Sequence, residues 1–184
     1  NKIFQIYVKK SLIREKIGLK DNNINTFYYK LLNIREDNSN IDDKITNCIN
    51  EVIPDIKKTN ENLSRVCKVI ANNLSISLHE NNIENIIINL SNYGLYEHEF
   101  IICRKIVDNK LNYYLLDPSF IQFKGTYPFL NLEKKDNKLL DNLINKSYSQ
   151  ISNESFQNYL EAFNYKDKKI DINNLFIEKI RKIK

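Results

Sequence analysis

The sequence predicts an α+β fold, in which helical N- and C-terminal segments surround a small antiparallel sheet. Strand-like runs on both sides of residues 107–110 indicate a β-hairpin. Stretches before and after it carry apolar residues at helical spacing. Three glycines and three prolines are too few for a β-sandwich or barrel with many turns, so we expect the rest of the chain to be largely helical.

Length and composition favour a single domain over residues 1–184, because 42% hydrophobic residues can form one sizeable core. Within it we expect a helical N-terminal part (1–58), a core of helix and sheet (59–125) and a helical C-terminal part (126–184). The chain begins at Asn1 and contains no methionine, so we expect it to be a piece of a longer protein.

Three helices are expected in the N-terminal part. The first spans residues 3–17 and ends at Gly18, the residue type that most often terminates a helix. The second spans residues 25–34, with its aromatic and leucine residues directed inward. The third spans about residues 41–52 and ends before Pro54, because proline disfavours a helix interior.

A further helix is expected around Cys67, since apolar residues at 63, 66, 67, 70 and 74 share one helix face. Ser64 is the expected N-cap, which makes Cys67 the third helical residue. Free N–H groups and the positive end of the helix dipole lower the pKa of a thiol there, so Cys67 is a candidate nucleophile. The alternative is a small buried apolar residue, as most free cysteines are.

The segment 83–90 is rich in isoleucine; we expect a helix, with a strand as the alternative. After the hairpin, residues 120–123 are expected to continue the sheet until Gly125 breaks it. Three helices are expected in the C-terminal part, at 139–144, 155–163 and 175–183.

The hairpin places a histidine and an aspartate together. If Asp108 and Asn109 are the two loop residues, His98 and Asp117 are diagonal neighbours on one face of the sheet. Backbones roughly 7–8 Å apart at such positions allow their side chains to form a hydrogen bond. A loop one residue longer or shorter places them on opposite faces. The alternative is that His98 starts an ordinary strand and Asp117-Pro118 simply ends the next one.

The other cysteines and the second histidine are interpreted as structural. Cys48 lies on an apolar helical stripe, and Cys103 lies across from Tyr114 on the face opposite His98, so both are expected in the core. His79 is expected in a polar turn at the surface, with a role as an alternative base less favoured. Three cysteines without metal-type spacing predict no disulfide framework, no metal site and a reducing compartment, and we expect no cofactor.

The order Cys67, then His98 at the start of a strand, then Asp117 near the end of the next, resembles the core of the transglutaminase-like and papain-like superfamily. This group includes transglutaminases, arylamine N-acetyltransferases, and bacterial effector or toxin proteases and glutamine deamidases. The phrase Leu-Leu-Asp-Pro-Ser-Phe at 115–120 is similar to the aspartate motif of effector cysteine proteases. The resemblance covers roughly residues 60–125. It implies that Cys67 begins a core helix packed against an antiparallel sheet.

The resemblance also implies a Cys-His-Asp triad and a protein substrate. His98 would take the proton of Cys67 and later protonate the leaving amine, while Asp117 would orient the imidazole. The intermediate would be a thioester on Cys67, resolved by water in a protease or deamidase and by an amine in an acyltransferase. The backbone N–H of Cys67 and the amide of Asn60 or Asn62 would be the oxyanion donors. The protein would then be cytoplasmic, or it would be an effector or toxin of this type that is secreted into a host cytosol.

Two other functions compete with this hypothesis. The first is a non-catalytic, mostly helical interaction domain, which the context of Cys67 favours: many family members have glycine before the nucleophile, but here Arg65-Val66 precede it. The second is nucleic-acid binding, suggested by a net charge of +5 but disfavoured because 28 basic residues are interspersed with 23 acidic ones. We expect no membrane span, because no apolar run approaches roughly 18 residues. The sequence makes no prediction of oligomeric state.

Overall fold

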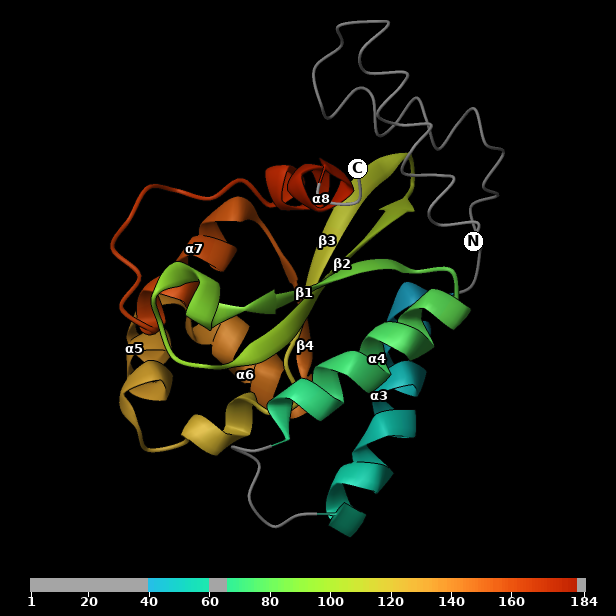
Figure 1. Ribbon diagram of the computed structural model, residues 1–184, viewed down its shortest axis with the longest axis horizontal. Helices are drawn as coiled ribbons and strands as arrows, with labels where there is room; N and C mark the ends of the chain where they lie inside the picture. Colours follow the sequence, from blue (N-terminus) through green and yellow to red (C-terminus); the bar gives the residue numbers. More distant parts are fainter. Residues whose placement is uncertain (1–39, 60–65, 182–184) are drawn as a thin grey trace, which may run out of the picture. The chain divides into compact units, whose positions relative to one another are not determined.

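The computed structural model describes residues 40–59 and 66–181 (Figure 1). The helices predicted at 3–17 and 25–34 lie outside the described residues. The chain divides into two compact units. Of the described residues, one unit comprises 40–59, 66–105 and 112–169, and the other comprises Ile106–Leu111 and 170–181. The single domain over residues 1–184 stays a prediction.

An antiparallel sheet forms the centre of the first unit. Its strands are β1 (Glu84–Asn89), β2 (Glu99–Val107), β3 (Lys110–Leu116) and β4 (Tyr148–Ile151), in the spatial order β1-β2-β3-β4 (Figure 1). The connection between β2 and β3 is the predicted two-residue loop, in which Asp108 and Asn109 have φ values of 50° and 63°. Two consecutive positive φ values are typical of the tight hairpin turn that matches the twist of its strands. The sheet and its flanking helices confirm the α+β prediction.

Two helices, α3 (Ile41–Thr59) and α4 (Cys67–Glu80), pack together on one face of the sheet. Asn40 accepts a hydrogen bond from the Asp42 N–H and so caps α3. The prediction that this helix ends before Pro54 was wrong, because it continues to Thr59. A proline removes a single N–H donor from the helical ladder, and the remaining bonds can continue the helix beyond it.

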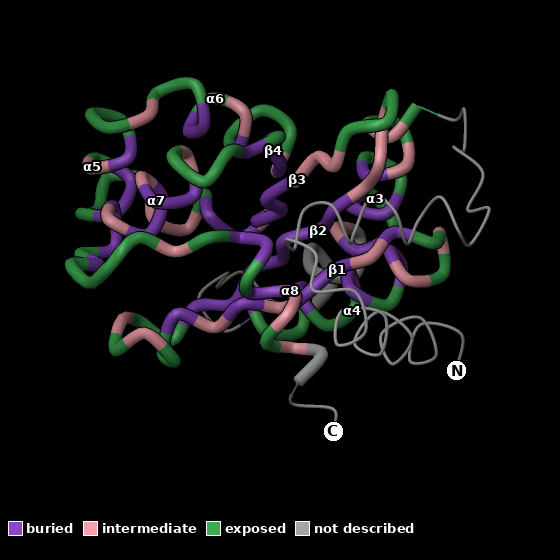
Figure 2. Tube along the Cα trace, turned by 90° about the horizontal axis from the view of Figure 1, so that it is seen from above, coloured by how far each residue is buried: buried purple, intermediate pink, exposed green. Residues whose placement is uncertain are grey.

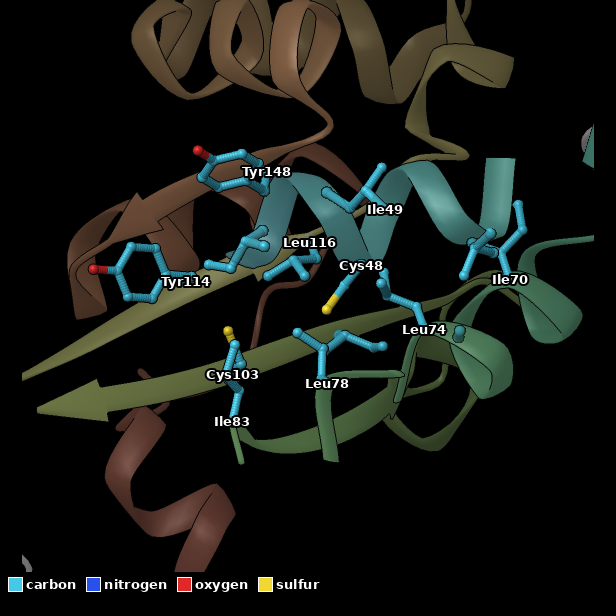
Figure 3. Close-up of a cluster of buried hydrophobic side chains, with 14 of the residues drawn as sticks. Cys48, Ile49, Ile70, Leu74, Leu78, Ile83, Cys103, Tyr114, Leu116 and Tyr148 are labelled. Atoms are coloured by element: carbon cyan, nitrogen blue, oxygen red, sulfur yellow. The ribbon is translucent and has the colours of Figure 1, made fainter. Parts of the chain in front are cut away.

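The side chains between these helices and the sheet form a buried cluster (Figure 3). Cys48 comes from α3, Leu74 and Leu78 from α4, and Cys103 and Leu116 from β2 and β3. The thiols of Cys48 and Cys103 both point into the cluster (Figure 3). The prediction that these two cysteines lie in the core is therefore confirmed.

On the other face of the sheet, α6 (Asn137–Lys146) and α7 (Asn153–Ala162) contact β4, and α5 (Tyr127–Lys135) packs against both helices. Phe100 of β2 lies on this face, where its ring contacts Phe156 and Tyr159 of α7. Figure 2 shows the strands as largely buried between the two groups of helices. This unit therefore has three layers, and successive residues of β2 point alternately to the α4 side and the α7 side.

Two predictions about secondary structure were wrong. The segment 83–90 contains β1 rather than a helix, because its β-branched isoleucines pair with β2, with Ile87 opposite Ile101. Residues 120–123 form a 3-10 helix, η3 (Phe120–Phe123), rather than a continuation of the sheet. The Phe120 N–H donates to the carbonyl of Asp117, which turns the chain as soon as β3 ends.

The predicted C-terminal helices at 139–144 and 155–163 are confirmed as α6 and α7. The one predicted at 175–183 is confirmed as α8 (Ile172–Arg181), which belongs to the second unit. Neither α5 nor β4 was predicted from the sequence. Within the described ranges, no helix is long and apolar enough to cross a membrane.

Candidate active site

Cys67 is the first residue of α4, and Val66 occupies the N-cap position without a side-chain hydrogen bond. The prediction that Ser64 caps this helix was wrong, because the helix begins at Cys67 itself; Ser64 lies outside the described residues. The N–H groups of a first helical turn have no intrahelical acceptor. The Cys67 sulfur lies within reach of two backbone N–H groups, those of Lys68 and Glu99. Cys67 therefore lies where backbone dipoles stabilise a thiolate.

His98 and Asp117 lie at the ends of neighbouring strands, directly before β2 and directly after β3. The Nε2 atom of His98 is 2.8 Å from Oδ2 of Asp117. The hydrogen bond predicted from the hairpin is therefore confirmed, although His98 precedes the strand rather than beginning it. Hydrogen bonding between the side chains of His98 and Cys67 also contributes to the pKa shift of each group. Because Asp117 occupies Nε2, we infer that Nδ1 is the ring nitrogen that faces Cys67.

Asp117 accepts two more hydrogen bonds from side chains. The Ser119 hydroxyl donates to Oδ1 over 3.0 Å, and the Tyr159 hydroxyl donates to Oδ2 over 2.6 Å. The Asp117 side chain is fully buried, and the Tyr159 side chain is equally inaccessible. A buried carboxylate needs such donors, because it would otherwise lose its hydration without compensation. Asp117 is thus fixed in one orientation toward His98.

Aromatic rings enclose the imidazole of His98. Phe100 and Phe163 stack on it, with ring centroids at 6.2 and 5.8 Å, and Phe123 meets it edge-on at 5.0 Å. His98 is 1% exposed as a result. These rings restrict the imidazole to one plane, so its two nitrogens face two different partners.

The electrostatic environment favours a charged Cys67–His98 pair. Burial opposes a charge on His98, but the charge and hydrogen bond of Asp117, together with Cys67, raise the pKa of His98 to about 9. The hydrogen bond from His98 lowers the pKa of the Cys67 thiol below its ordinary value, although burial acts in the opposite direction. Both shifts favour a thiolate on Cys67 beside an imidazolium on His98.

The other two cysteines behave differently. Burial raises the pKa of both the Cys48 thiol and the Cys103 thiol above the ordinary value. Both side chains are almost inaccessible, and all three cysteines are free. Cys67 is therefore the one acidic thiol among them.

Of the other residues considered from the sequence, His79 does not join this cluster. Asn60 and Asn62 lie outside the described residues, so their role as oxyanion donors stays a prediction. The prediction that His79 lies in a polar turn was wrong, because α4 continues to Glu80 and includes it. Twelve residues of helix separate His79 from Cys67, about 18 Å along the axis. His79 therefore cannot serve as the base for Cys67.

Sequence reasoning missed three residues of the cluster. Ser119 lies in the phrase at 115–120, where a hydroxyl two residues after an aspartate is a recognisable local partner for it. Gln122 places its Nε2 atom 3.5 Å from Nδ1 of His98. Neither Gln122 nor Tyr159 carries a sequence signal, because both reach the site through the fold.

No metal site accompanies the cluster in the part of the chain that the structure describes, where no three His, Cys, Asp or Glu residues could hold an ion together. Comparisons with protein-family models, with curated proteins and with solved structures found no match to this chain. The resemblance to the transglutaminase-like and papain-like superfamily thus stays a prediction.

Proposed function

We propose that this protein is a thiol-dependent enzyme that acts on an amide of a protein substrate, as a cysteine protease, a glutamine deamidase or an acyltransferase. One observation carries the proposal. The thiol at the N-terminus of α4 is hydrogen-bonded to His98, whose other ring nitrogen is 2.8 Å from the buried carboxylate of Asp117. A nucleophile, a base and a group that orients the base are thus held in sequence.

The first half of the proposed reaction forms a thioester. The Cys67 thiolate attacks the carbonyl carbon of the amide, and the electron pair of the C=O bond moves to oxygen. When the tetrahedral intermediate collapses, the C=O bond re-forms and the C–N bond breaks. The leaving nitrogen takes the proton from Nδ1 of His98, so the products are an amine, an acylated Cys67 and a neutral imidazole.

The second half releases the acyl group. Neutral His98 accepts a proton from water, or from an amine, as that nucleophile attacks the thioester carbon. The C–S bond then breaks and the thiolate returns beside the imidazolium. Asp117 keeps Nε2–H as its donor throughout, which leaves Nδ1 as the atom that exchanges protons.

The proposed setting follows from the resemblance and from the cysteines. The phrase Leu-Leu-Asp-Pro-Ser-Phe supports a bacterial toxin or effector that modifies a host protein. The three free cysteines support a reducing compartment, such as a host cytosol. No cofactor enters the proposed reaction.

A second candidate function is a non-catalytic interaction domain that keeps this fold. Low accessibility favours it, since Cys67 is 7% exposed and His98 is 1% exposed. Catalysis at such a site requires that a substrate carbonyl reach the sulfur, whereas a structural role does not. The two candidates therefore differ in the reactivity expected of Cys67.

Acyl transfer from p-nitrophenyl acetate separates the two functions. The enzyme hypothesis predicts a burst of nitrophenolate at neutral pH and an acetyl group on Cys67, mapped by mass spectrometry of proteolytic peptides. Cys48 and Cys103 should stay unmodified, and the Cys67→Ala variant should show no burst. Slow acetylation spread over surface lysines, with Cys67 unmodified, would exclude the catalytic hypothesis and favour the interaction domain.

A further inference from the structure

Gln122 lies in η3, the short helix that follows directly after Asp117. The Phe120 N–H donates to the Asp117 carbonyl over 3.1 Å, and the Gln122 N–H donates to the Ser119 carbonyl over 3.0 Å. These hydrogen bonds place the backbone of Gln122 in the turn that also contains Asp117. The side chain of Gln122 is half-buried, and its amide nitrogen is 3.5 Å from Nδ1 of His98.

The position of this amide relative to the sulfur follows from the ring of His98. Nε2 of His98 is hydrogen-bonded to Asp117, so we infer that Nδ1 is the nitrogen that faces Cys67. The Gln122 amide approaches that same edge of the ring. It therefore lies beside the sulfur–nitrogen pair, where the carbonyl carbon of a bound substrate would be attacked.

The hydrogen-bonding capacity of the amide is not used by the charged pair. In the imidazolium, Nδ1 carries a proton that it donates to the thiolate, so Nδ1 cannot accept from the Gln122 NH₂ group. Within the described residues, Nδ1 is the one atom within hydrogen-bond distance of that nitrogen. The NH₂ group can accordingly donate to an oxygen that arrives with the substrate.

We propose that the side-chain amide of Gln122 is an oxyanion donor of this site, acting with the backbone N–H of Cys67 at the start of α4. The proposal rests on the catalytic function above. The two donors come from different elements, one from the N-terminus of α4 and one from η3. Such donors lower the barrier because they stabilise the negative oxygen that develops when the thiolate attacks. Gln122 is thereby a catalytic residue, since it touches the reacting oxygen.

Two reactions at Cys67 distinguish this role from a structural one. Acetylation by p-nitrophenyl acetate passes through an oxyanion, whereas alkylation by iodoacetamide displaces iodide and forms none. The Gln122→Ala variant is expected to slow acetylation of Cys67 by about 10²–10³-fold and to leave alkylation unchanged. Gln122→Glu has nearly the same shape but no NH₂ group, so the same loss is expected if the donor matters rather than the packing.

Gln150→Ala is the matched control, because Gln150 lies on β4 and its side chain donates to Asn112 at the surface. It should leave both rates unchanged, and thermal unfolding should show that all variants fold. If the Gln122 variants keep the full acetylation rate, or lose both rates equally, Gln122 is not an oxyanion donor. If the wild-type Cys67 reacts with neither reagent, the proposed enzyme function fails, and this inference fails with it.

Discussion

Replacing His98 with alanine is expected to slow acetylation of Cys67 at neutral pH by about 10³-fold or more. Two contributions of His98 to the acetylation rate disappear together. The hydrogen bond that lowers the pKa of the Cys67 thiol comes from His98, so the thiolate fraction falls when it is removed. The proton donor and acceptor for both half-reactions is also lost. The burst of nitrophenolate measures the combined effect.

The matched control is His79→Ala, which removes the same type of side chain from the other end of α4. It should acetylate at the wild-type rate. Alkylation by iodoacetamide separates the two contributions, because it depends on the thiolate but not on proton donation. For His98→Ala, alkylation at neutral pH should fall by roughly 10-fold or more, reflecting the loss of thiolate alone. An unchanged acetylation rate would exclude His98 from the proposed mechanism.

Replacing Asp117 with alanine is expected to lower the free energy of unfolding by about 3–5 kcal/mol. The change leaves the Tyr159 hydroxyl, the Ser119 hydroxyl and His98 without their shared acceptor. All three groups are buried, so water does not replace the lost bonds. Urea denaturation measures the loss. Glu161→Ala, which breaks a surface ion pair with Lys135, should change stability by about 1 kcal/mol or less.

The pH dependence of stability gives a second test of the Asp117 contact. The pKa of His98 is about 9 in the folded protein, above its unfolded value of about 6.5. The stabilisation from charged His98 is therefore complete below about pH 6.5 and is lost as the pH rises through about 9. The lowered pKa of Cys67 makes stability change with pH in the opposite direction. The effect of Asp117 is therefore measured in a Cys67→Ala background.

In that background, Asp117→Asn should weaken the alkaline loss of stability, because the carboxylate charge and its hydrogen bond raise the pKa of His98. A variant that unfolds at the same urea concentration as its parent at every pH would show that Asp117 does not stabilise the charged imidazole.

The part of this site that the sequence predicted is the part encoded locally. The loop residues Asp108 and Asn109 define a two-residue turn, and the alternation of strand side chains then brings His98 and Asp117 together. The inward direction of Cys67 follows from the helical period, although the start of its helix was predicted too early. Such patterns depend on residues close in the sequence.

The parts that the sequence did not predict depend on distant partners. The isoleucines of β1 fit either a helix or a strand, and pairing with β2 decides between them. Tyr159 reaches Asp117 across 42 residues, from α7 on the sheet face that carries Phe100. Gln122 reaches His98 because η3 turns back where a continuing strand was expected. No spacing rule encodes these contacts.

Cys67 and His98 are proposed to form a thiolate–imidazolium pair. The pH dependence of Cys67 alkylation tests this ion pair most directly. The rate constant with iodoacetamide, followed at Cys67 by peptide mass spectrometry, should reach a plateau below the ordinary thiol pKa of about 8.5. A second transition should appear near pH 9, where His98 loses its proton. A single transition at the ordinary thiol value, with Cys67 no more reactive than Cys48 or Cys103, would contradict the ion pair and the proposed enzyme.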